Sequence, residues 1–269
     1  MVRILWVYAR HGPMPKAKSS NIVDIAHLRK SCRACSLRDL CLPLGLEADD
    51  LERLESVVHT RGPIRPGEHL FREGDPFHAI YAVKSGALKT YTIDSQGREH
   101  VLGFHIAGEL AGFDGIYPGK NRCNAAALQS TSVCVLPFSR LEQVLQEVPG
   151  LQAQVLRLMS RELSANAQLA TDHSAEERLA GFLLGLSRRF ERRGCSPLRI
   201  SLPMPRRDIA SHLRLATETV SRLFARFQEE GIVSVQRRDV EILDMPTLER
   251  LGAVYDVEGG RTQQRPQAT

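Results

Sequence analysis

Three cysteines stand close together near the start of the chain and offer metal-binding chemistry. Cys32, Cys35 and Cys41 follow a Cys-x2-Cys-x5-Cys spacing. Thiolates bind zinc and iron–sulfur clusters, and both kinds of centre use four protein ligands. Cys123, Cys134 or Cys195 could supply the fourth ligand, and spacing alone does not choose among them. Free or oxidisable thiols are the alternative interpretation.

A second chemistry is concentrated in the C-terminal third, where positive charge gathers. Between residues 188 and 238, twelve basic residues stand against five acidic ones, which leaves +7, more than the +5 of the whole chain. All twelve are arginine, whose planar guanidinium suits phosphate oxygens and guanine edges. This segment therefore predicts nucleic-acid binding.

Within that segment, residues 207–227 have the pattern of a helix, a tight turn and a second helix. Ile209, Ala210 and Leu213 form the predicted inner face of the first helix, and Thr217 is a candidate N-cap of the second. The exposed start of the second helix would then meet base edges in the DNA. A solvated amphipathic helix is the alternative. The residues predicted to form the DNA interface are Arg207, Thr217, Glu218, Thr219, Ser221, Arg222 and Arg226. The predicted inner face of the second helix is Val220, Leu223, Phe224 and Phe227.

The elements that must position these residues differ along the chain. Short β-type runs separated by turn signals over residues 67–138 predict an antiparallel roll, barrel or sandwich. Short helices are expected at 48–58, 175–193, 206–213 and 217–230, followed by a hairpin at 233–243. Residues 1–31 are expected to form a flexible arm, and 259–269 a frayed end.

A long helix is expected at residues 149–172, and its apolar pattern has two interpretations. Residues spaced 3, 4, 3, 4 form a heptad seam that favours a partner helix, hence a homodimer. The neighbouring stripe of Leu151, Val155 and Leu158 could instead pack on the roll of the same chain, and both can hold at once. The predicted seam is Leu156, Met159, Leu163, Asn166 and Ala170.

Composition limits the class of protein. A chain of 269 residues predicts two domains and a connection, and 42% hydrophobic with 25% charged residues is typical of a globular protein. The sequence contains neither an apolar run long enough for a membrane span nor a pattern expected of a signal peptide. We therefore expect a cytoplasmic protein with reduced thiols and no membrane partner.

Residues 30–245 resemble the FNR type (fumarate and nitrate reduction regulator) of the cyclic-AMP receptor protein superfamily. The resemblance implies an α+β fold: an antiparallel β-roll like a cyclic-nucleotide-binding domain, a long dimerisation helix and a winged helix-turn-helix. The expected domains are 32–148, 149–172 and 173–247, with a tail at 248–269. The segments that carry the resemblance, besides the cysteine run, begin at Phe71, Tyr81, Gly103, Val133, Arg157, Ala175 and Thr217.

The resemblance also implies a cofactor and a function. Matching the motif residue by residue gives Cys32, Cys35, Cys41 and Cys134 as ligands of an oxygen-labile [4Fe–4S] cluster. The expected function is a transcription regulator, not an enzyme. As a homodimer it would bind double-stranded DNA at TTGAT-N4-ATCAA-like inverted repeats and work with RNA polymerase on genes of anaerobic or microaerobic metabolism. Asn166 departs from the pattern, since many relatives carry an acid there.

A cyclic-nucleotide-responsive regulator of the same fold is the alternative function. Gly108-Glu109-Leu110 resembles the ribose-binding Gly-Glu-Leu of the nucleotide branch, and Arg122 could stand in for its phosphate-binding arginine. Aligned on Gly108 and Gly112, however, that branch's acid falls at the apolar Phe113, and Arg122 lies about one position off. The register therefore argues against a nucleotide site.

Overall fold

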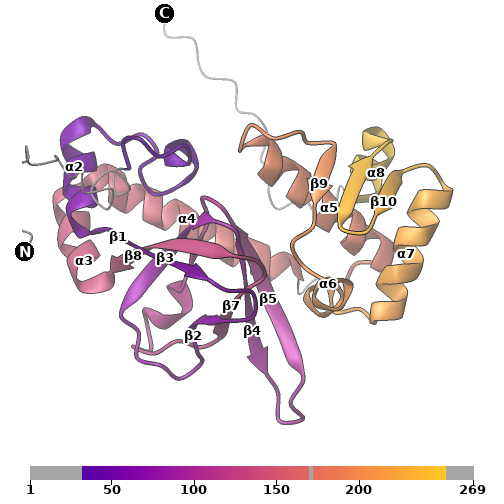
Figure 1. Ribbon diagram of the computed structural model, residues 1–269, viewed down its shortest axis with the longest axis horizontal. Helices are drawn as coiled ribbons and strands as arrows, with labels where there is room; N and C mark the ends of the chain where they lie inside the picture. Colours follow the sequence, from indigo (N-terminus) through magenta and orange to yellow (C-terminus); the bar gives the residue numbers. More distant parts are fainter. Residues whose placement is uncertain (1–31, 170–171, 253–269) are drawn as a thin grey trace, which may run out of the picture.

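The structure is a computed structural model that describes residues 32–169 and 172–252. The predicted arm at 1–31, the frayed end at 259–269 and Ala170 lie outside the described residues, as does the side chain of Asn166. The cysteine segment and a β-roll form one part of the chain, and a helical domain with a small sheet forms the other (Figure 1). None of the helices in the described ranges is long and apolar enough to cross a bilayer.

The roll consists of two four-stranded antiparallel sheets, which confirms the predicted fold class. Tight turns join the strands, and Gly86 shows why one of them needs glycine. Its φ is +86°, and a Cβ there would lie 2.5 Å from the Ser130 carbonyl oxygen. In spatial order one sheet contains β1 (His59–Ile64), β8 (Thr131–Pro137), β3 (Ala79–Ser85) and β6 (Leu110–Ala111). The other contains β2 (His69–Phe71), β7 (Asn124–Ala127), β4 (Ala87–Ile93) and β5 (Glu99–Ile106).

Three helices and the cysteine segment cover one side of the roll. They are α2 (Ala48–Val57), α3 (Phe138–Glu147) and α4 (Pro149–Leu169). The cysteine segment itself contains only the short 3-10 turn η1 (Arg38–Leu40). Sequence patterning missed α3, because it follows β8 without a turn signal and only Leu141 and Val144 are buried along it. Fully buried leucines join these elements to the roll in one core.

The two stripes of α4 have different environments in the single chain. Leu151, Val155 and Leu158 are buried against the core of the roll, so the stripe expected to pack on the same chain does so. Leu156 and Leu163 are 60% and 72% exposed. These two leucines of the predicted seam are thus available to a partner helix.

The C-terminal domain pairs helices with a three-stranded antiparallel sheet in the order β10-β11-β9. Ser174 and Glu177 form a capping box that starts its first helix. The predicted tail boundary at 248 falls inside the last helix, where Leu248 is fully buried. Its end approaches α5 so closely that a Cβ on Gly252 would lie 2.8 Å from the Gly181 nitrogen. The elements are α5 (Ala175–Glu191), β9 (Arg199–Ser201), α6 (Arg206–Leu213), α7 (Thr217–Glu229), β10 (Val233–Gln236), β11 (Asp239–Ile242) and α8 (Met245–Gly252).

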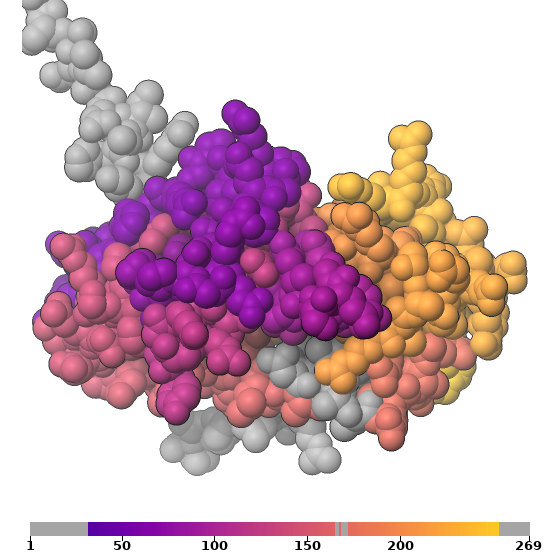
Figure 2. Space-filling model, turned by 90° about the horizontal axis from the view of Figure 1, so that it is seen from below, coloured from indigo at the N-terminus to yellow at the C-terminus, as the bar shows by residue number. Residues whose placement is uncertain are grey.

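The two parts of the chain pack directly on each other, with α6 against β5 (Figure 1). Phe104 of the roll contacts Phe182 of α5 and His212 of α6, with ring centroids 6.1 and 5.2 Å apart. Ser211 adds polar contacts, because its hydroxyl donates to the Glu99 carbonyl and accepts from the Val101 amide, each at 2.9 Å. The space-filling view shows the two parts in contact, without an open gap between their surfaces (Figure 2).

Burial of His212 in this contact predicts a pH-dependent stability. Burial lowers the pKa of His212 from 6.5 to about 4, opposed by hydrogen bonds to the backbone of Val101 and Leu102. The unfolded chain therefore binds the proton more readily, and stability is lost as the pH falls from 6.5 toward 4. We expect His212→Phe to remove about 1–2 kcal/mol of the loss in unfolding free energy between pH 7 and pH 5, measured by urea unfolding.

The matched control is His59→Phe, since His59 is exposed on β1. It should leave the pH dependence as in the unmodified protein. An unchanged pH profile in His212→Phe would show that this imidazole does not titrate on unfolding.

Candidate metal centre and nucleic-acid interface

The four cysteines predicted as ligands line one cavity of about 40 Å³ between the cysteine segment and the roll. Cys32, Cys35 and Cys41 come from the turns that precede α2, and Cys134 comes from β8. The rest of the wall is mainly apolar, with Lys84 and Arg38 as its cationic members. Segments far apart in the sequence thus bring four thiols to a single place.

Local contacts hold the cysteine segment on the roll. Leu42 and Leu46 are buried in the core shared with α4. The Arg33 amide donates to the Glu55 carboxylate at 2.8 Å, and its guanidinium donates to the Ala48 carbonyl at 2.9 Å. Apolar anchors therefore follow the cysteines, and polar contacts fix the turns between them.

The environment of three of these thiols, Cys32, Cys41 and Cys134, disfavours the thiolate form. Burial, reinforced by Cys134 and Glu55, raises the pKa of Cys32 to about 12. Burial also raises the pKa of Cys41 to about 12 and raises that of Cys134, although Lys84 opposes the shift at Cys134. Negative charge on Cys35 or Cys134 would raise the pKa of Cys32, and negative charge on Cys32, Cys35 or Cys134 would raise the pKa of Cys41. A cationic centre bound among them would offset this burial of negative charge.

The other two cysteines are not among the residues that line this cavity. Cys123 is 3% exposed and donates from its thiol to Asp114 at 3.4 Å, whereas Cys195 is exposed beyond α5. Within the described ranges, no three His, Cys, Asp or Glu side chains are grouped as a site for a metal ion. A tetrahedral zinc site would need sulfurs about 3.8 Å apart, given Zn–S bonds of about 2.3 Å. The four thiols that line this cavity are donors of the kind that hold zinc or an iron–sulfur cluster.

The helix-turn-helix forms as predicted, with one correction at its second helix. Arg214 takes a left-handed conformation (φ 56°) at the end of α6 and turns the chain toward α7. The N-cap of α7 is Ala216, so the prediction that Thr217 caps this helix is wrong: Thr217 is its first residue, and the cap makes no side-chain hydrogen bond. The predicted inner faces are buried, except Leu223, which is half-buried.

Most of the predicted base-reading side chains are accessible. Glu218 and Arg222 are exposed at the start of α7, and Thr219 is half-buried. Ser221 is exposed and donates to the Thr217 carbonyl at 2.9 Å, a bond within the helix that an approaching base edge can replace. The first two turns of α7 therefore present a polar face to solvent, opposite the buried Val220 and Phe224.

Three arginines near this face have structural partners. Arg226 donates to Glu230 at 2.7 Å and to Glu176 at 3.2 Å, so any phosphate that bound it would compete with these carboxylates. Arg207 is 77% exposed beside Asp208. Sequence reasoning missed Arg206, whose guanidinium lies 3.6 Å from the centre of the Phe224 ring and braces α6 against α7.

The residues considered for a nucleotide site are not arranged to bind one. The Glu109 carboxylate is buried and already binds Arg189 of α5 at 2.5 Å and Arg193, just beyond the end of α5, at 2.7 Å. Arg122 is exposed, and its backbone amide donates to Asp114. Phe113 packs against the core of the roll at the position where the nucleotide branch has its acid. The ribose-type ligand position is thus filled by the chain's own arginines.

Comparison with known proteins agrees with this architecture. A cyclic nucleotide-binding domain model matches residues 62–148, and a Crp-like helix-turn-helix domain model matches residues 177–251. The chain is 45% identical over 216 residues to the transcriptional activator protein Anr of Pseudomonas aeruginosa, covering 79% of this chain and 88% of that protein. This chain belongs to the Crp/Fnr family. The family consists of transcription regulators, so the prediction that the chain is not an enzyme is confirmed.

Further relatives place the chain with the Fnr type. It is 41% identical over 223 residues to the fumarate and nitrate reduction regulatory protein of Escherichia coli K12, covering 82% of this chain and 89% of that protein. The structure of FixK2 from Bradyrhizobium japonicum is similar, with a TM-score of 0.64, 29% identity and coverage of 72% of this chain and 96% of that one. The family resemblance drawn from the sequence is therefore confirmed.

The different burial of the cysteines predicts an order of alkylation in the metal-free protein. At pH 8 a small iodoacetamide-type reagent should modify the exposed Cys195 first. Cys123 should react last, after unfolding, because burial and the neighbouring Asp114 raise its pKa and close access to it. Mass mapping over time gives the order, and Cys195→Ser should remove the fastest phase. Early modification of Cys123 would contradict the packing around Asp114.

Proposed function

We propose that the chain is a cytoplasmic, oxygen-responsive transcription regulator that binds one [4Fe–4S] cluster per subunit and acts on DNA as a homodimer. The observation that carries this proposal is the meeting of Cys32, Cys35, Cys41 and Cys134 at one mainly apolar cavity. Fe–S clusters in proteins are held by four such ligands. The similarity to Fnr-type regulators supports the same assignment.

When bound, the cluster supplies an iron centre that oxygen can destroy. The chain's own residues explain why the cysteine segment can influence the rest of the protein. Leu42 and Leu46 share a core with Leu151 and Val155 at the start of α4, and a Cβ on Gly150 would lie 3.6 Å from the Leu46 side chain. An ordered segment therefore supports the first turns of α4, and a displaced segment removes that support. Such a differential contact is the minimum requirement for a switch.

The cluster assignment predicts different effects for matched cysteine variants. Protein purified without oxygen should be brown, contain about four iron and four sulfide per chain, and bleach in air. Cys134→Ser should abolish cluster retention because it removes the ligand from β8. Cys123→Ser is the control and should retain the cluster, since Cys123 is outside the cavity. Absorption spectra with iron and sulfide analysis decide the result, and a colourless protein with one zinc per chain would overturn the assignment.

The DNA contact is proposed to be made by α7 in the major groove of TTGAT-N4-ATCAA-like inverted repeats. Glu218 can accept from a cytosine amino group, and Arg222 can donate two hydrogen bonds to guanine. Their exposure at the start of α7 supports this role. Two such helices, one from each subunit, would read half-sites about one helical turn apart, and RNA polymerase would be the partner at the promoter.

Two arginines of α7 should affect DNA binding differently. Arg222→Ala should cost about 1–3 kcal/mol at the specific site and reduce discrimination at the guanine pair. Arg226→Ala should weaken all sequences alike, because a phosphate contact carries no sequence information. Its effect should be small, since Glu176 and Glu230 already neutralise Arg226. Titrations with specific and scrambled DNA distinguish the two effects. If Arg222→Ala kept its base preference, the face of α7 that carries Arg222 would not be the one that reads the bases.

The exposed seam of α4 is proposed to form the dimer. Replacing both Leu156 and Leu163 by Ala should weaken dimerisation at least about tenfold while leaving the unfolding of the monomer nearly unchanged, because both side chains are exposed in the single chain. Leu198→Ala, at another exposed leucine, is the control and should leave the dimer intact. Sedimentation over a concentration series measures the change. A dimer of undiminished affinity in the double variant would show that the interface lies elsewhere.

A further inference from the structure

We propose that Glu109 clamps the DNA-binding domain onto the roll by binding Arg189 and Arg193, and that this clamp pre-orients α7 for DNA. The Gly-Glu-Leu turn would thus serve as a binding site for the chain's own second domain. The effect on domain orientation is independent of the proposed cluster and of the DNA sequence. Only the consequence for DNA affinity rests on the proposed function.

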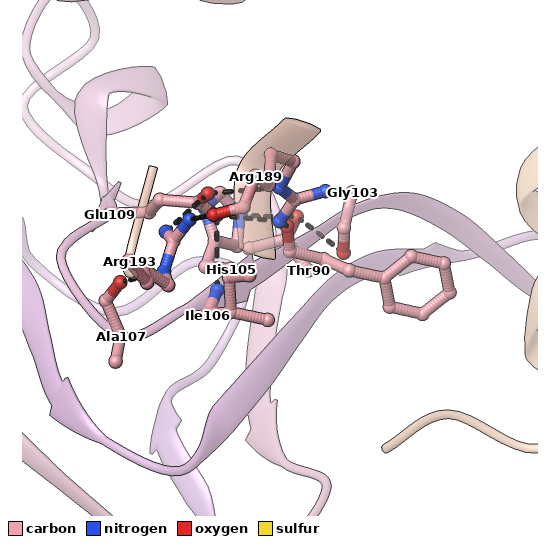
Figure 3. Close-up of polar contacts among 9 residues, drawn as sticks. Thr90, Gly103, His105, Ile106, Ala107, Glu109, Arg189 and Arg193 are labelled. Carbon is pink, nitrogen blue, oxygen red and sulfur yellow. Dashed lines mark hydrogen bonds and ion pairs between the residues drawn. The ribbon is translucent and has the colours of Figure 1, made fainter. Parts of the chain in front are cut away.

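The contact is a compact network between the turn after β5 and the C-terminal end of α5, with Arg189 in the helix and Arg193 just beyond it (Figure 3). Arg189 donates to both Glu109 oxygens, at 2.9 and 2.5 Å, and to the Phe104 carbonyl at 2.7 Å. Arg193 donates to Glu109 at 2.7 Å and to the Ala107 carbonyl at 2.6 Å. The Ile106 amide completes the shell of Glu109 at 3.0 Å. The Glu109 carboxylate and the Phe104 and Ala107 carbonyls are therefore all engaged by the two arginines.

The network is buried, which makes its completeness important. The side chains of Glu109 and Arg193 are 10% exposed and that of Arg189 is 16% exposed. Removing one partner of a buried ion pair leaves the other charge desolvated, and this is far more destabilising than losing a surface pair. Burial alone would raise the pKa of Glu109, but the two guanidinium groups hold it at about 2, so the carboxylate is charged throughout the physiological range.

A second ionic contact closes the opposite end of the interface. Lys89 on β4 lies 3.2 Å from Asp208 on α6 and 2.5 Å from Glu99 on β5, and the Lys89 and Asp208 side chains are almost fully buried. Between the two ionic ends lies the aromatic contact of Phe104 with Phe182 and His212. Apolar packing alone permits sliding or rotation, whereas directional charge contacts at both ends fix one register. The domain is therefore held in a defined orientation.

Orientation matters for DNA because a dimer must place two recognition helices on two half-sites at once. The stacking of Arg206 on Phe224 and the shared core of α6 and α7 make these helices one unit, so fixing α6 on β5 also fixes α7. In the clamped arrangement the Glu218 and Arg222 face of α7 is exposed. A domain released from the roll would have to be re-ordered at each binding event, which lowers affinity.

The first test uses amide hydrogen exchange on the full-length, metal-free chain, with neither cluster nor DNA. Glu109→Gln keeps the shape of the side chain and removes its charge. We expect exchange in β5 and α6 to accelerate about tenfold or more, with little change in β8. Glu142→Gln, at an exposed acid on α3, is the matched control and should exchange like the unmodified protein. Unchanged exchange in Glu109→Gln would overturn the clamp.

A double-mutant cycle distinguishes loss of the contact between Glu109 and Arg193 from a general loss of stability. Arg193→Gln removes only one of the two guanidinium groups, so it should give a smaller acceleration in the same segments. In the double variant the acceleration of exchange should be smaller than the product of the accelerations in the two single variants, because each substitution removes the same contact. Strictly multiplicative effects would show that Glu109 and Arg193 act separately and would contradict the proposal.

The consequence for DNA is measured with cluster-loaded dimer. Glu109→Gln should lower affinity for the inverted repeat about tenfold while iron content and dimerisation stay unchanged. If Glu109→Gln showed faster exchange but unchanged or higher DNA affinity, the clamp would stand and the claim that it pre-orients α7 for DNA would be overturned. Failure of the unmodified protein to bind the repeat would count against the proposed function, and the exchange result would still decide the clamp.

Discussion

Burial of Leu42 and Leu46 against the roll is the constraint on which the rest of the arrangement depends. These two side chains share a core with Leu54 of α2, Leu141 of α3 and Leu151 of α4. Leu42 and Leu46 directly follow the last cysteine of the segment, so their burial in this core holds the cysteine turns beside β8. A change in the cysteine segment is therefore also a change in the packing under α4, because both use the same buried leucines.

The sequence was sufficient for the class of fold and for most helices, because their signals are local. Residues 206–213 have the same bounds in pattern and structure, and the hairpin after α7 also lies where it was expected. Two helices escaped prediction. No turn signal separates α3 from the strand before it. The position of α8 depends on a tertiary contact, its fit against Gly181 and Leu184 of α5. The predicted Thr217 cap was wrong by one residue, because α7 begins at Thr217 and Ala216 takes the N-cap position.

The candidate site was predictable only in part. The spacing of Cys32, Cys35 and Cys41 marks a ligand segment, but the fourth member of the set depends on which strand faces that segment. Register places Cys134 opposite Thr60 and Ala82, and this pairing cannot be read from the cysteine positions. The partners of Glu109 were equally hidden, because Arg189 and Arg193 are 80 and 84 residues away in the chain. In the sequence, Arg189 and Arg193 could be recognised only as two members of the basic segment at residues 188–238.

The structure connects the roll to the DNA-binding domain by two routes of different character. One runs along α4, where apolar packing under the cysteine segment meets the exposed seam. The other crosses directly from β4 and β5 to α5 and α6 through buried charges. Apolar contacts tolerate small shifts, whereas a buried ion pair is satisfied in one geometry and costly in others. The first route is therefore suited to a change of state, and the second to holding α7 in place on the subunit that changes.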